Sequence, residues 1–176
     1  MTPDSRQRFE RIERQKQTVL SNIAGWPAEQ IRFRPKPAAW SALDVLDHIV
    51  KTEQATFAIA RKQLPNRTPV SFSDRMRGMV VIAVMQSPVR AKVPAAATMV
   101  LPANTDLPEI SSRWAAVRLE IFDLLQSLQP ENSRCGLFRH PVSGWMDVSQ
   151  TLAFTSAHLR HHVYQLDRLK SASRMG

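Results

Sequence analysis

The sequence predicts an all-α protein: a four-helix bundle with one long crossover connection and an extra short helix. Apolar residues recur at helical spacing in four long segments, which are separated by stretches containing proline. The alternation typical of a half-buried strand is not found, and residues 98–102 (TMVLP) are the one weak strand candidate. A chain of 176 residues with no visible repeat is expected to form a single domain over residues 1–176.

The first two long helices are expected at residues 4–24 and 41–63. The first carries an apolar stripe that ends before Gly25: Phe9, Ile12, Val19, Leu20 and Ile23. Two prolines in residues 31–40 exclude a regular helix there. Ser41 and Asp44 resemble a capping box, and the helix that follows would be about 34 Å long.

Residues 64–106 are expected to form the crossover. They contain five prolines and one short helical segment around residues 72–86. A connection of this length can run back along the bundle, which predicts that the helices on either side of it are parallel.

The last two long helices follow the crossover. The third is expected to begin after Asp106 and to end before Pro130. After a loop, Asp147 and Gln150 resemble a second capping box, and the fourth helix is expected from residue 148 to about residue 171.

Composition narrows the class of protein. The formal net charge is +9, but no run of five or more basic residues occurs, which is typical of a solvated surface and predicts no nucleic-acid partner. Residues 1–17 are too charged for a signal peptide, and the longest apolar stretch, residues 79–85, is too short to cross a membrane. The single cysteine, Cys135, cannot form an intrachain disulfide. We therefore expect a cytoplasmic protein with no membrane partner.

Three of the five histidines lie in the segment SAHLRHHVYQLDRL, residues 156–169. On a helix, His158 and His162 are about 40° apart and share the apolar stripe, whereas His161 lies to its side. Two imidazoles separated by one turn can both reach a metal ion. The alternative is a pair of buried histidines that form hydrogen bonds with their surroundings.

The two remaining histidines differ in whether they could supply a third metal ligand. His48 lies at the edge of the apolar stripe of the second long helix, where it could face a neighbouring helix. His140, before Pro141, is better explained as a turn residue that forms hydrogen bonds within its own loop. Glu53 lies near the centre of the same apolar stripe as His48, and it either accepts a hydrogen bond from a ligand imidazole or pairs with an arginine. The arginine pairing is favoured.

Two motifs, in this order, resemble the DinB-like family of metal-binding helical bundles. WSALDVLDHIVKTEQ, residues 40–54, has a Trp-Ser pair that opens the second long helix and a histidine seven residues after the serine. HPVSGWMDVSQTLAFTSAHLRHHVYQL, residues 140–166, has a His-Pro-x-x-Gly loop followed by a helix with H-x-x-x-H and then glutamine. Two ordered motifs are more specific than one histidine pair.

The resemblance implies a divalent ion, zinc or nickel, held by His48, His158 and His162, and a homodimer. It assigns no role to His161. Relatives include thiol-dependent transferases and isomerases, in which the metal activates a low-molecular-weight thiol, and proteins labelled metal-dependent hydrolases. No general acid or base is evident near the three histidines, so catalytic and substrate-binding residues stay unassigned.

The first functional hypothesis is therefore a metal-dependent thiol transferase, isomerase or hydrolase that acts on a small molecule. The nucleophile would be a metal-bound water or thiolate, and the basic surface would attract an acidic thiol such as a glutathione-like carrier. The second hypothesis is a non-catalytic binding module stabilised by the metal. The third, a basic nucleic-acid-binding bundle, is the weakest because aromatic and basic residues do not interleave.

Overall fold

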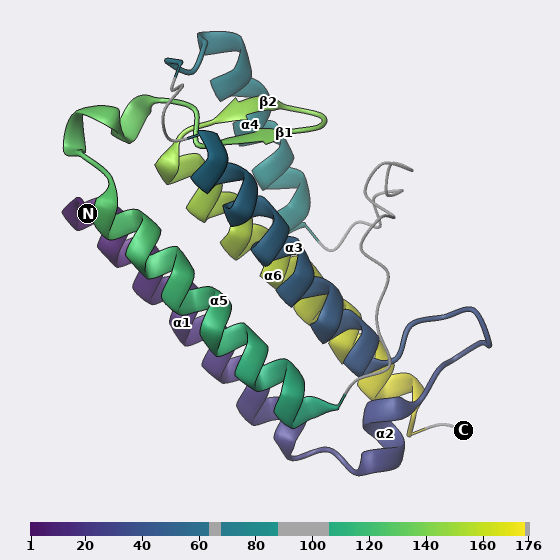
Figure 1. Cartoon of the computed structure of the whole chain (residues 1–176). Coiled ribbons are helices and arrows are strands. Elements are labelled where there is room, and N and C mark those ends of the chain that lie inside the picture. Colours follow the sequence, from purple (N-terminus) through teal and green to yellow (C-terminus); the bar gives the residue numbers. More distant parts are fainter. Residues whose placement is uncertain (64–67, 88–105, 175–176) are drawn as a thin grey trace.

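The computed structural model describes residues 1–63, 68–87 and 106–174. Four long helices form a bundle: α1 (Pro3–Ala24), α3 (Ala42–Gln63), α5 (Leu107–Ser127) and α6 (Val148–Ala172). A shorter helix, α4 (Phe72–Gln86), packs against α6 on the side away from α1 and α5 (Figure 1). The predicted class, an all-α bundle with an extra short helix, is confirmed.

Helices α3 and α5 run in the same direction. Arg113, early in α5, bonds Asp47, early in α3, whereas Arg61, near the end of α3, donates to the Glu120 carbonyl further along α5. Figure 1 shows α3 and α5 beginning at the same end of the bundle, so the connection between them is a crossover. The predicted crossover between a parallel pair of helices is confirmed.

Of the two expected capping boxes, the one at the start of α3 is complete and the one at the start of α6 is only half formed. At the start of α3 the box is complete, because the Asp44 amide donates to Ser41 Oγ at 3.3 Å and the Ser41 amide donates to Asp44 Oδ2 at 2.7 Å. At the start of α6, Asp147 accepts from the Gln150 amide at 2.8 Å. The Gln150 side chain does not reach back, however, because it donates instead to the Arg75 carbonyl of α4 at 2.8 Å.

A short hairpin corrects the loop expected before the last helix. Strands β1 (Phe138–His140) and β2 (Gly144–Met146) pair antiparallel, with Phe138 opposite Met146. Strands of three residues are too short to show a pattern of alternation, which is why no strand is expected here from the residue pattern. The weak strand candidate at residues 98–102 lies outside the described residues.

Two further short elements were also not expected. Helix α2 (Ala28–Arg32) is one turn long and overlaps the start of the proline-containing connection. A 3-10 helix, η3 (Pro130–Arg134), follows α5 directly. Both are single turns, and so short a segment has no apolar stripe by which it could be recognised.

A buried ion pair joins α3 to α5 inside the bundle. Arg118 Nη2 lies 2.8 Å from Glu53 Oε1, and Trp114 Nε1 donates to Glu53 Oε2 at 2.9 Å. All three side chains are buried. The favoured interpretation of Glu53, pairing with an arginine, is thus confirmed. Both carboxylate oxygens have partners inside the bundle.

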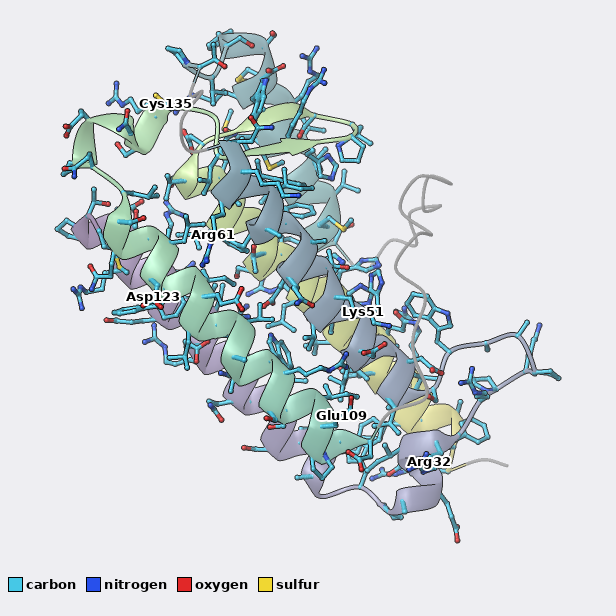
Figure 2. All side chains as sticks on the ribbon, viewed as in Figure 1. Arg32, Lys51, Arg61, Glu109, Asp123 and Cys135 are labelled. Atoms are coloured by element: carbon cyan, nitrogen blue, oxygen red, sulfur yellow. The ribbon has the colours of Figure 1, made fainter. Side chains whose placement is uncertain are left out.

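Charged side chains are distributed along the whole bundle rather than gathered on one element. Figure 2 labels Arg32, Lys51 and Arg61, which lie well apart on α2 and on the two halves of α3. Among the helices of the described ranges, none is both long enough and apolar enough to span a membrane.

Candidate metal centre

The structure brings His48, His158 and His162 together. His48 extends from α3, and the other two lie one turn apart on α6. One ring nitrogen of each histidine lies within 4.8 Å of those of the other two. The two Nε2 atoms on α6 are 3.1 Å apart, and the ring centroid of His48 is 5.0 Å from that of His162 and 5.4 Å from that of His158. The cluster therefore links two helices whose histidines are far apart in the sequence.

Burial keeps the paired imidazoles neutral. His158 and His162 are buried, while His48 is half-buried. Burial, with the neighbouring His162 as a second cause, holds the pKa of His158 well below its ordinary value. Burial, followed by the neighbouring His48, lowers the pKa of His162 to about 3. Neutral imidazole is the form that has a lone pair available for a metal ion.

Gln165 determines which nitrogen of His162 faces the cluster as an acceptor. Its Oε1 atom lies 2.9 Å from His162 Nδ1. A carbonyl oxygen only accepts hydrogen bonds, so Nδ1 carries the proton and the lone pair of the neutral ring is on Nε2. That lone pair points toward His158 Nε2. A cation shared by the two rings would be bound from this direction.

Aromatic rings hold the other two imidazoles. Trp40, which precedes α3, lies with its ring centroid 4.9 Å from that of His48. Phe154, one turn before His158 on α6, stacks on the His158 ring at 5.9 Å with 25° between the ring planes. These contacts restrict the rotamers of both imidazoles and place apolar surface beside the cluster.

The remaining two histidines lie outside the cluster. His140 Nδ1 accepts hydrogen bonds from the amides of Val142 and Ser143 at 3.2 and 3.3 Å, so the expected role within its own turn is confirmed. His161 is half-buried, with its ring centroid 5.4 Å from that of His162, and it contributes no atom to the three-histidine group. This position agrees with the helical periodicity, which predicts His161 to the side of the apolar stripe.

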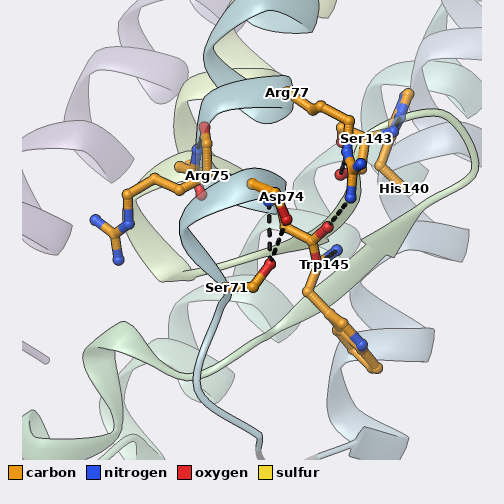
Figure 3. Close-up of polar contacts among 9 residues, drawn as sticks. Ser71, Asp74, Arg75, Arg77, His140, Ser143 and Trp145 are labelled. Carbon is orange, nitrogen blue, oxygen red and sulfur yellow. Dashed lines mark hydrogen bonds and ion pairs between the residues drawn. The ribbon is translucent and has the colours of Figure 1, made fainter.

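The His-Pro-x-x-Gly motif builds the hairpin turn and fastens it to α4. Gly144 has a positive φ of 80°, and a Cβ atom there would lie 2.6 Å from Asp74 Oδ1. Asp74 also accepts from the Trp145 amide at 3.2 Å, and Arg77 donates to the Ser143 carbonyl at 3.4 Å (Figure 3). Sequence reasoning missed this link between α4 and the hairpin, although Ser71 and Asp74 have the spacing of a helix start.

The fold and the cluster together define a class: helical-bundle proteins whose interior presents three histidines to one point. The chain belongs to the DinB superfamily, whose family model matches residues 11–166. The family resemblance noted in the sequence is thereby confirmed.

The fold is also similar to a solved structure from Bacillus subtilis, YfiT. The TM-score is 0.60 with 14% sequence identity, and the similarity covers 100% of this chain and 90% of YfiT. YfiT is described as "a probable metal-dependent hydrolase with an unusual four-helix bundle topology". At this identity, the similarity shows a shared fold. Among curated proteins, no match to the chain was found.

Proposed function

We propose that the chain binds one divalent cation, zinc or nickel, through His48, His158 and His162, and that it is a metal-dependent enzyme acting on a small molecule. The observation that carries this proposal is the convergence of three imidazole nitrogens within 4.8 Å. Two buried imidazoles packed side by side are costly to desolvate, and a cation shared between them satisfies both lone pairs.

The donor set suits the proposed metal. Three imidazole nitrogens are typical of zinc and nickel rather than of magnesium or calcium, which prefer oxygen ligands. Three protein ligands leave at least one coordination position for another molecule. When bound, such a cation polarises a substrate and lowers the pKa of a coordinated water or thiol.

The surrounding residues have supporting roles in this proposal. Gln165 fixes the tautomer of His162 through the 2.9 Å hydrogen bond, so that Nε2 is the ligand atom. Trp40 and Phe154 orient His48 and His158 and exclude water from one side of the cluster. The chain itself would thus pre-position its ligands before the metal arrives.

We infer two candidate reactions, hydrolysis or a transfer or isomerisation that uses a low-molecular-weight thiol. The formal net charge of +9 favours an acidic thiol, because a basic surface raises the local concentration of anions. The single cysteine, Cys135, favours a reducing compartment such as the cytoplasm. The homodimer implied by the family resemblance is part of the same proposal.

A non-catalytic metal-binding module is the second candidate. One observation favours it: among the described residues, the group of ligand atoms that lie within 4.8 Å of one another consists of the three histidines, with no Asp, Glu or Cys among them, and Glu53 is paired with Arg118. A panel of esters and thiol cofactors distinguishes the two candidates. Turnover that disappears in His162→Ala supports the enzyme, and metal binding without turnover of any compound supports the module.

Metal analysis of untagged protein tests the site itself. We expect about one divalent metal ion per chain in the wild type and a large loss in each of the His48→Ala, His158→Ala and His162→Ala variants. His161→Ala is the matched control, because it removes an adjacent imidazole of the same helix that lies outside the cluster. Full occupancy in His48→Ala would overturn the three-histidine site.

A further inference from the structure

His140 has one ring nitrogen that the hairpin turn uses and one that the turn leaves free. Its Nδ1 atom accepts hydrogen bonds from the amides of Val142 and Ser143. A ring nitrogen that accepts from an amide carries no proton, so the proton of the neutral imidazole is on Nε2. Burial lowers the pKa of His140 below its ordinary value, which keeps the ring neutral at neutral pH. In the described part of the chain, no acceptor bonds this Nε2–H group.

The ring of His140 is separated from the metal centre by a single aromatic side chain. Alternate residues of a strand share a face, so His140 and Phe138 both lie on the face of β1 that packs on α6. The His140 ring meets Phe154 edge-on, with 4.9 Å between the ring centroids. The same phenylalanine stacks on His158 at 5.9 Å. A molecule bound at the histidine cluster therefore has to extend past only one ring to reach His140.

The turn that carries His140 is held rigidly by α4. Arg77 of this helix donates to the Ser143 carbonyl at 3.4 Å, and Asp74 accepts from the Trp145 amide at 3.2 Å. Figure 3 shows these contacts beside the His140 side chain. Helix α4 supplies no ligand to the histidine cluster, yet it fixes the turn next to it. A half-buried polar side chain on so rigid a support is typical of a residue that positions a bound molecule.

We propose that His140 is a substrate-binding residue, whose Nε2–H group donates a hydrogen bond to the molecule that binds at the three-histidine centre. This inference rests on the proposed function, because it needs a molecule coordinated to the metal. It also defines a class of ligand. The molecule carries an acceptor oxygen, such as that of an amide or a carboxylate, beyond the atom that it gives to the metal. The metal selects the coordinating atom, and His140 selects the part of the molecule that follows.

The alternative is that His140 serves the turn alone, and asparagine separates the two roles. The Oδ1 atom of asparagine can accept from the same two amides as His140 Nδ1, so the turn keeps its hydrogen bonds. The asparagine side chain is too short to place a donor where Nε2 lies. His140→Asn therefore removes the free donor and retains the turn. His161→Asn is the matched control, because it removes an imidazole of α6 that lies outside the cluster.

Titration of the cobalt(II)-loaded full chain with thiols tests the proposal. A thiolate that coordinates cobalt(II) produces an absorption band, so binding is measured without turnover. The probes are uncharged mercaptoamides with about two to five methylene groups between sulfur and amide, each matched with an alkanethiol of equal length. We expect at least one amide to bind about two- to tenfold more tightly than its alkanethiol. The preference should persist in His161→Asn and disappear in His140→Asn.

Heteronuclear NMR of the zinc-loaded wild type gives a readout that needs no substitution. We expect the Nε2–H tautomer at His140, and an Nε2 chemical shift that changes with the preferred amide but not with its alkanethiol. This shift decides the question if His140→Asn does not fold. A wild-type chain that binds no cobalt would overturn the proposed metal site, and this inference with it. A chain that binds cobalt but shows no preference for any amide, or the same preference in His140→Asn, would overturn the inference alone.

Discussion

Acidification should destabilise the metal-free protein through the histidine cluster. The perturbation is a change from pH 7 to pH 5 in the presence of a chelator. The pKa of His162 is about 3 in the folded chain, lowered by burial and by His48, against an ordinary value of 6.5 when the chain is unfolded. Below pH 6.5 the unfolded chain therefore binds a proton at this residue that the folded chain does not bind.

The size of the effect follows from these two values. Stability due to neutral His162 is fully present above pH 6.5 and is lost progressively as the pH falls toward 3. Between pH 7 and pH 5 the loss is about 2 kcal/mol from His162 alone. The pKa of buried His158 is lowered as well, so its contribution has the same sign. A bound metal ion should make the loss smaller, since it stabilises the folded state.

Urea denaturation followed by circular dichroism, with chelator, at pH 7 and pH 5 measures this difference. His162→Ala should lose less stability on acidification than the wild type, by about 2 kcal/mol. His161→Ala controls for the loss of a more exposed imidazole nearby and should keep most of the wild-type dependence. Equal pH dependence in the wild type and His162→Ala would refute the argument that burial keeps His162 neutral.

Three further substitutions test the fold around the site. Arg118→Met leaves Glu53 buried without its ion-pair partner and should lower the free energy of unfolding by about 3 to 5 kcal/mol in urea titrations; a loss below about 1 kcal/mol would contradict this role. Gly144→Ala forces a Cβ toward Asp74 at positive φ, so it should cost about 1 kcal/mol or more and speed hydrogen exchange of the α4 amides; unchanged exchange would argue against the link. Ser41→Ala removes the α3 cap and should lower stability by about 1 kcal/mol in the same titrations, with no loss expected if the cap contributes nothing.

The helices of the fold could be predicted from the sequence because their signals are local. The Ser41 cap and the apolar stripes depend only on residues within a few turns of one another. The hairpin could not be predicted, because its two strands of three residues are held by contacts from a distant helix, such as Asp74 with the Trp145 amide. The same dependence on a distant helix explains why Gln150 bonds Arg75 rather than completing its capping box.

The candidate site, like the fold, could be predicted from the sequence only in part. Periodicity placed His158 and His162 on one buried face, because both are on the same helix. His48 lay only at the edge of its own stripe, and no local pattern says which helices become neighbours, so the family resemblance was needed to select it. The contacts of Gln165 and Trp40 with the cluster depend on rotamers that a sequence pattern does not determine.

The distribution of the three histidines over α3 and α6 has a consequence for biosynthesis. During translation, α3 leaves the ribosome long before residues 158 to 162 have been added to the nascent chain. The two histidines on α6 can make a partial site by themselves, but the third donor joins them only when α6 has packed against α3. Metal loading is therefore expected to follow synthesis of α6, and a chain truncated before residue 158 should acquire no ion at this site.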